Sequence, residues 1–249
     1  MKVTSAVGEV TNLKIFKPIQ YLVVKGTSIQ NFHKIKVRAR VVNSMSGRVD
    51  EIIPSIDLQT LGEIASLNEG FYLRNGSNGT YCVNIMLHPT SSVYLSNDKY
   101  LEVDVLGNGE NEPIEVYGLE TNVIEKDFVC RYNKFYMSVG ELQKTFSVGE
   151  NENLIMPTIS FAEITLQYKT GTSCSYTKEE LDAMMMLKND LVFVYSRSAS
   201  CADTGSESQQ CYGYATNFAL DLSDVSDFTI KRDYATEAFG VVMIDTLKD

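Results

Sequence analysis

Apolar and polar residues alternate one by one over several stretches of this chain. Residues 33–42 place four apolar side chains between lysines and arginines, and residues 80–88 and 99–106 repeat the alternation with other residues. A period of two is typical of β-strands that pack one face on a core. We therefore predict a first core that contains Ile35, Val37, Val83, Ile85, Val103 and Val105.

Apolar residues at helical spacing are rare. They predict one helix near residues 56–66 and a second near residues 178–188. Thr177 and Glu180 have the T-x-x-E spacing of a capping box, which predicts where the second helix begins. We interpret the methionines at 184–186 as core packing rather than as ligands.

The order of the predicted elements in the first half of the chain returns in the second half. Phe161 lies 129 residues after Phe32, and at that shift a strand over 161–170 falls on the strand over 33–42. We match the other elements of the two halves in the same order: 18–26 with 142–150, 80–88 with 213–222, 99–106 with 227–232, and 113–120 with 239–247. The stretch between each first strand and its helix reads as a polar linker.

This duplicated order predicts two similar all-β domains, residues 1–121 and 122–249. The stretch 122–139 is apolar enough to be ordered, so we expect the domains to dock through a fixed interface. About eight short strands and one helix in each half are typical of a jelly roll. The chain has no Trp, which argues against an immunoglobulin sandwich, and its helices do not alternate with strands as in βαβ enzymes. We predict two tandem jelly-roll barrels, a double jelly roll, each with a short inserted helix.

The net charge of the chain limits the classes of molecule that it is expected to bind. The 249 residues carry a formal charge of −10 and a pI of about 4.8. An acidic surface repels phosphate, so we expect no direct contact with nucleic acid. No apolar run approaches the roughly 20 residues that span a bilayer, and the N-terminus lacks the apolar stretch of a signal peptide. A protein made in a cytosol is expected.

Motifs that carry enzymatic chemistry are missing from the sequence. Neither glycine-rich phosphate-binding motifs nor the nucleophile and metal motifs of hydrolases occur. The two histidines, His33 and His88, stand at the ends of predicted strands and read as ordinary surface or turn residues. We predict a protein that is not an enzyme, with no catalytic residue, no metal and no cofactor.

The remaining polar groups have structural explanations. The five cysteines include no C-x-x-C pair, and we interpret Cys82 and Cys130 as small buried hydrophobes. The acidic pair at 179–180 suits the first turn of the predicted helix. The three aspartates between 221 and 227 lack the glycine-centred loop of a calcium site.

A basic stripe lies along the polar face of the strand over 33–42. Its counterparts in the second half include one acidic and one basic residue, so the two outward faces should differ in charge. The stripe could be a solvated strand face, or it could meet an acidic neighbouring subunit or anionic lipid. The stripe consists of Lys34, Lys36, Arg38 and Arg40, and the counterparts are Glu163, Thr165, Gln167 and Lys169.

Four stretches carry a resemblance to a known family: "QNFHKIKVRARVVNSMSGRV" (30–49), "SIDLQTLGEI" (55–64), "ISFAEITLQYKTG" (159–171) and "YTKEELDAMMM" (176–186). The repeated strand, short linker and short helix resemble the double jelly-roll major capsid proteins of membrane-containing icosahedral phages. These are the corticovirus and finnlakevirus groups of the adenovirus-hexon-like lineage.

The resemblance implies a structural capsid protein rather than an enzyme. It implies a homotrimer whose six barrels form a pseudo-hexameric capsomer, next to other capsomers and capsid proteins in a virion shell. It also implies assembly in the host cytoplasm and an internal viral membrane beneath the shell. The chain is short for this family, so its surface towers should be small. A viral spike or a carbohydrate-binding module is the alternative function.

Residues 196–218 read as a polar loop that has no equally long counterpart in the first half. In a capsid protein such a loop belongs on the outside of the particle. If the loop is a hairpin, the Cα atoms of Cys201 and Cys211 would come within roughly 5–6 Å, which suits a disulfide. A reducing cytosol would instead keep two free thiols, and the sequence leaves both alternatives open.

Overall fold

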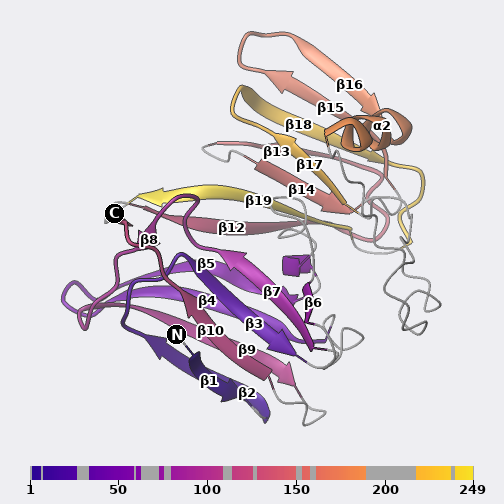
Figure 1. Ribbon diagram of the computed structural model, residues 1–249. Helices are drawn as coiled ribbons and strands as arrows, with labels where there is room; N and C mark the ends of the chain where they lie inside the picture. The colour runs from indigo at the N-terminus through magenta and orange to yellow at the C-terminus, as the bar shows by residue number, and fades with distance from the viewer. Residues whose placement is uncertain are drawn as a thin grey trace. The chain divides into compact units, whose positions relative to one another are not determined.

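The chain folds into antiparallel sheets that occur in two sets (Figure 1). The computed structural model describes residues 2–6, 8–26, 34–58, 60–62, 73–75, 80–108, 114–125, 128–149, 153–157, 161–188, 217–236 and 239–248. Two compact units divide the chain: Met1–Asn133 with Ile244–Asp249, and Lys134–Met243. The chain therefore leaves the first unit within strand β12 (Phe128–Met137) and returns to it within strand β19 (Phe239–Lys248).

The first set contains two large sheets. One has the order β1 (Lys2–Ala6), β10 (Ile114–Leu119), β3 (Tyr21–Gly26), β7 (Thr80–Met86) and β6 (Leu73–Asn75). The other has the order β2 (Gly8–Ile15), β9 (Lys99–Asn108), β4 (Lys36–Asn43) and β5 (Arg48–Asp57). A short parallel pair joins β8 (Ser92–Val93) to β11 (Ile124–Glu125).

The second set again contains two sheets. One has the order β12, β19, β14 (Asn153–Pro157) and β17 (Asn217–Asp221). The other has the order β13 (Gln143–Ser147), β18 (Val225–Arg232), β15 (Phe161–Tyr168) and β16 (Ser173–Thr177). Helix α2 (Lys178–Lys188) follows β16 directly.

The two sets correspond strand by strand. The sheet β1-β10-β3-β7 has the order of β12-β19-β14-β17, and β2-β9-β4-β5 has the order of β13-β18-β15-β16. Chain order is kept throughout, and a helix follows the fifth strand of the second set. The fold is all-β and a double jelly roll, as the alternation and the repeated order predict.

Four of the predicted matches between the halves are confirmed by equivalent sheet positions: β4 with β15, β7 with β17, β9 with β18 and β10 with β19. The match of 18–26 with 142–150 is wrong. Residues 18–26 contain β3, whose counterpart is β14, whereas residues 142–150 contain β13, the counterpart of β2. Alternation reports which face of a strand is buried, but not which strand lies beside it.

The two predicted polar linkers are also wrong, because both are strands. β5 pairs with β4 through a tight hairpin in which Asn43 Oδ1 accepts the backbone N–H groups of Met45 and Ser46, and Gly47 has a φ of 72°. β16 pairs with β15 at the edge of its sheet. In β5 the adjacent Ile52 and Ile53 interrupt the alternation at a register shift, and β16 has only five residues with Ser or Thr at every second position, so both stretches read as polar linkers.

The stretch 122–139 contains β12, a strand of the second set, in agreement with its predicted order. One further boundary differs from the prediction. β5 runs through Asp57, whose carboxylate accepts the Thr60 N–H at 2.8 Å, and residues 58 and 60–62 are helical. The first helix therefore starts at 58 rather than 56. The boundary between the two jelly rolls at residues 121 and 122 stays a prediction. The fixed interface between them also stays a prediction.

Each unit buries an apolar core. The six residues predicted for the first core are each no more than 2% exposed, which confirms the register of β4, β7 and β9. In the second unit Phe161, Ile164 and Leu166 are buried on β15. The rings of Phe146 and Phe228 stack there with centroids 5.1 Å apart. The capping box is confirmed: Thr177 N–H donates to Glu180 at 2.8 Å, and Glu180 N–H donates to Thr177 Oγ1 at 3.3 Å.

Candidate assembly surfaces

The one histidine in the described part of the chain has a structural role. His88 is fully buried, and its Nδ1 accepts the backbone N–H groups of Thr90 at 3.2 Å and Ser91 at 3.0 Å. The ring therefore holds the turn that follows β7, which confirms the turn role among the two expected from the sequence, although the side chain is buried rather than on the surface. His33 lies outside the described residues.

No group of three or more His, Cys, Asp or Glu side chains that could hold a metal occurs among the residues that the structure describes. Cys82, Cys130 and Cys174 are not part of a disulfide. Cys130 is buried as predicted, whereas Cys82 is half-buried, and burial raises the pKa of its thiol. Cys201, Cys211 and most of the loop 196–218 lie outside the described residues, so their disulfide stays a prediction.

Carboxylates have local partners instead of a shared ligand. Glu180 belongs to the capping box, Asp221 accepts the Ser223 N–H at 2.9 Å, and Asp227 accepts the Ser226 hydroxyl at 2.9 Å. Such turn and cap contacts satisfy carboxylates without chemistry.

A network of ion pairs covers the outward face of the sheet β2-β9-β4-β5. Arg40 Nη2 lies 2.9 Å from Asp104 Oδ2 and 3.1 Å from Glu102 Oε2 on β9. Arg38 Nε lies 2.7 Å from Glu51 Oε1 on β5. The arginines of the basic stripe are thus neutralised within their own sheet, while Lys34 and Lys36 are exposed.

The equivalent face of the second unit carries hydroxyl groups instead. Thr145, Thr229, Thr165 and Ser175 stand in register across all four strands of β13-β18-β15-β16. The hydroxyls of Thr145 and Thr229 share a hydrogen bond of 2.8 Å, and those of Thr165 and Ser175 share one of 2.7 Å. The two equivalent outward faces differ in chemistry, in agreement with the predicted difference in charge.

The first half of β12 covers part of the sheet β1-β10-β3-β7-β6 in the first unit. Tyr132 is 2% exposed and donates its hydroxyl to the Met86 carbonyl at 2.8 Å, and burial raises the pKa of that hydroxyl. Arg131 Nε donates to Asp245 Oδ1 at 2.9 Å, which joins β12 to the last strand, β19. Asp245 is 3% exposed, so this pair is shielded from solvent on the acidic side.

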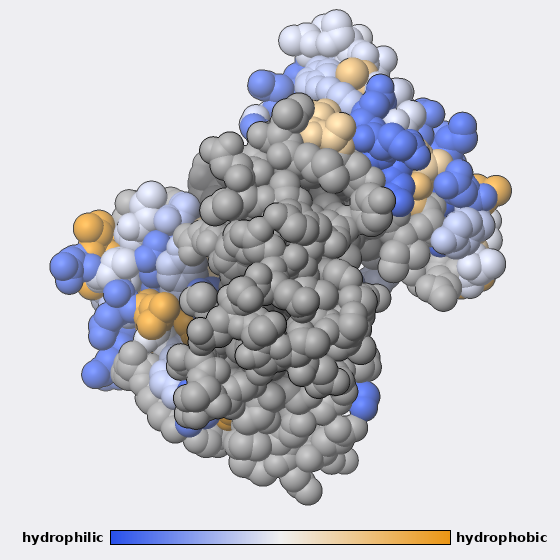
Figure 2. All heavy atoms as spheres, turned by 45° about the vertical axis from the view of Figure 1, so that its right-hand side comes forward, coloured by the Kyte–Doolittle hydropathy of each residue, from blue (hydrophilic) through white to orange (hydrophobic). Residues whose placement is uncertain are grey.

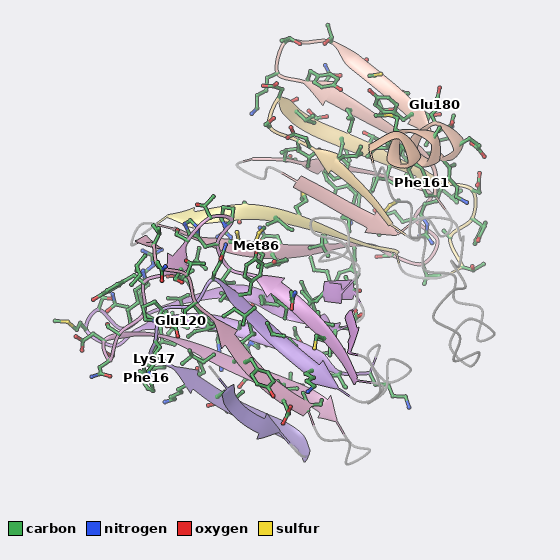
Figure 3. The ribbon with its side chains drawn as sticks, viewed as in Figure 1. Phe16, Lys17, Met86, Glu120, Phe161 and Glu180 are labelled. Carbon is green, nitrogen blue, oxygen red and sulfur yellow. The ribbon has the colours of Figure 1, made fainter. Side chains whose placement is uncertain are left out.

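Large apolar side chains are exposed at one end of the first unit. Phe16, Met45, Val49, Leu119 and Val123 are between 42% and 82% exposed. Gln20 N–H donates to the Leu119 carbonyl, which brings the segment after β2 beside the end of β10. Figure 3 shows Phe16, Lys17 and Glu120 together in this region, and Figure 2 shows apolar side chains among hydrophilic ones at the left of the molecule.

Sequence reasoning identified the basic stripe but missed its partners. Glu102 and Asp104 stand out as the polar residues of an alternating strand, yet nothing local indicates that β9 lies beside β4. Glu51 lies in a stretch that reads as a linker. Strand pairing between residues about 60 positions apart, such as Arg40 and Glu102, is decided by tertiary structure.

No described helix has the length and apolar character needed to cross a membrane. No protein-family model matches the chain, and no curated protein matches it by sequence. Solved structures do match it by fold. The major capsid protein P2 of bacteriophage PM2 gives a TM-score of 0.59 at 9% identity, over 100% of this chain and 95% of that one.

A chain from the atomic structure of Sulfolobus turreted icosahedral virus gives a TM-score of 0.54 at 10% identity, over 98% of this chain and 86% of that one. Agreement from end to end with so few shared residues means that the architecture is common and the side chains are not. The chain thus has the double jelly-roll fold of viral capsid proteins, which confirms the predicted resemblance at the level of fold.

Proposed function

We propose that this chain is the structural major capsid protein of an icosahedral virus. The observation that carries the proposal is the strand-by-strand duplication of one jelly roll over the whole chain, in a fold that PM2 major capsid protein P2 matches over 95% of its own length. A chain with two barrels is suited to tiling, because each barrel offers its own lateral surface.

The surface chemistry supports a structural role. The two equivalent outward faces have diverged into ion pairs on one barrel and hydroxyls on the other. Barrels that occupy unlike surroundings in a shell need unlike surfaces. The formal charge of −10 favours a shell without direct contact with nucleic acid. We propose no enzymatic activity, since His88 and the described carboxylates have structural partners.

In the proposed assembly three copies form a trimer whose six barrels give a pseudo-hexameric capsomer. Capsomers then contact one another and other capsid proteins in the virion shell, with assembly in the host cytoplasm and an internal viral membrane beneath. Residues 196–216 would form a loop on the outside of the particle, closed by Cys201 and Cys211 if they are bonded, since residues 217 and 218 belong to β17.

Light scattering coupled to size exclusion tests the assembly state. A trimer of 27.8 kDa chains should have a mass of about 83 kDa. A monomer that binds an immobilised glycan would instead favour the carbohydrate-binding alternative. Negative-stain microscopy of material from the native source then decides the function, because particles with hexagonal capsomers that contain this chain are expected, and their absence would contradict it.

A further inference from the structure

The outward face of β2-β9-β4-β5 carries a row of alternating charges. Backbone register places Lys14 opposite Glu102, Glu102 opposite Arg40, and Arg40 opposite Glu51. Read across the four strands, the charges are positive, negative, positive and negative. We name these four residues the charge row.

A second row, made of apolar side chains, runs beside the charge row toward the end of the sheet. The rings of Phe16 and Tyr100 have centroids 5.2 Å apart, Tyr100 is opposite Val42, and Val42 is opposite Val49. Phe16 is 42% exposed and Val49 is 55% exposed. We name these four residues the apolar row. On the other side of the charge row, Asp104 is opposite Arg38.

The charge row is complementary to itself when its order is reversed. If two copies meet face to face about a two-fold axis parallel to the strands, each row meets the same row in reverse. Lys14 then faces Glu51 of the second copy, Glu102 faces Arg40, and each pair occurs twice. In the neighbouring row Asp104 faces Arg38, and in the apolar row Phe16 faces Val49 while Tyr100 faces Val42. Each of these five opposed pairs is oppositely charged or apolar.

We propose that this face is a two-fold contact between two copies of the chain. A second copy is the occupant that the charges select, because alternating signs across neighbouring strands match a reversed copy and do not match a uniformly anionic lipid surface. The row sums to zero charge on a chain whose total is −10, so two copies can approach here without the repulsion that the rest of the surface produces. The apolar row supplies burial, while the exposed charges set the register.

The fold does not require this pattern. On the equivalent face of the second unit the corresponding strands carry the hydroxyl row of Thr145, Thr229, Thr165 and Ser175. The turn that corresponds to the β4–β5 hairpin, residues 169–172, is exposed and contains no large apolar side chain. One of two duplicated faces therefore has the charge row and the apolar row together.

The inference goes beyond the proposed function, because a two-fold contact is a property of the purified chain whether or not a shell forms. A charge exchange tests it. Lys14→Glu and Glu51→Lys each place like charges opposite each other twice, so each single change should weaken self-association at least about tenfold in sedimentation velocity. The double variant exchanges the two charges and should return to within about threefold of the wild type.

A matched pair of changes tests the apolar row. Val49→Asp, on the edge strand β5, should weaken association at least about tenfold, whereas Ser173→Asp, on the equivalent edge strand β16, should leave it unchanged. Circular dichroism and the unfolding temperature serve as folding controls for all five variants.

The proposal is overturned if the wild type shows no two-fold species at the highest soluble concentration. It is also overturned if the single variants associate like the wild type, or if the charge exchange fails to restore association. A trimer that persists unchanged in every variant would overturn the two-fold contact and leave the proposed function standing, and a two-fold dimer without any trimer would do the reverse.

Discussion

Individual polar side chains in this protein depend on partners that the fold brings from distant strands. Asp104 is 9% exposed and remains compatible with burial because Arg40 and the Asn12 amide both contact its carboxylate, the latter at 2.6 Å. Buried charge without such contacts is strongly unfavourable. At the core positions the surrounding side chains are apolar, so a charged residue introduced there would have no partner.

Val37→Asp should lower the free energy of unfolding by about 3–5 kcal/mol, because it buries an unpaired carboxylate. Val37 is 0% exposed between Val105 on β9 and Ile56 on β5. Urea unfolding measures the change. Lys36→Asp, which places the same residue on the exposed face of the same strand, is the control and should cost much less. An unchanged stability of Val37→Asp would show that the register of β4 is wrong.

His88→Leu should lower the free energy of unfolding by about 2 kcal/mol, because the buried N–H of Ser91 and the neighbouring N–H of Thr90 lose their acceptor. His88→Asn keeps an acceptor oxygen near the place of Nδ1. Although Asn is smaller and more polar than Leu, we expect it to be the more stable replacement in thermal unfolding. The opposite ranking would show that volume, and not the hydrogen bonds, decides this site.

At the scale of the element, turn and cap chemistry decides where strands and helices begin. Asn43 and Gly47 form the turn of the β4–β5 hairpin. The Asp57 carboxylate accepts the Thr60 N–H in the first turn after β5. Thr177 and Glu180 start α2 immediately after β16, so a strand and a helix meet without a linker. α2 thus follows β16 directly, just as the first helix follows β5 directly.

Thr177→Ala should destabilise α2 by about 1 kcal/mol, because the Glu180 N–H loses its hydroxyl acceptor. Thr177→Ser retains that acceptor and should stay within a few tenths of a kcal/mol of the wild type. Hydrogen exchange of residues 178–184 measures the local effect. Equal exchange in both variants would contradict a role for the capping box.

At the scale of the whole molecule, residues of the last strand, β19, are divided between the first and the second unit. The division of the chain assigns Ile244–Asp249 to the first unit, where Asp245 pairs with Arg131 and Ile244 is 6% exposed. The end of the chain therefore stabilises strands that are more than a hundred residues away in sequence. Contacts between residues so far apart in sequence form slowly during folding, and removal of this strand would remove them.

Removal of residues 244–249 should increase hydrogen exchange at residues 129–133, which lose their neighbouring strand. Exchange in β15, at residues 161–168, should change little, because its partners β16 and β18 are retained. Asp245→Asn keeps the strand and removes the charge that pairs with Arg131, so it should produce a smaller effect of the same kind. Equal loss of protection in both regions would contradict the division of the chain.

Several features of this protein were determined by its sequence alone. Period-two alternation indicated the strands and their buried faces, down to Val37 and Val105. The T-x-x-E spacing at Thr177 located the start of α2, and the repeated order indicated two jelly rolls. These features are local, because side-chain direction along a strand and the hydrogen bonds of a cap depend on residues only a few positions apart.

Other features were decided only by tertiary structure. That β13 corresponds to β2, that Arg40 meets Asp104, and that the charge row and the apolar row share one face all depend on which strands are neighbours. β5 and β16 resembled linkers because adjacent Ile52 and Ile53 interrupt the alternation of β5, and β16 is a short strand rich in Ser and Thr. Pairing across long stretches of chain is selected by the packing of the whole sheet, and a local pattern cannot report it.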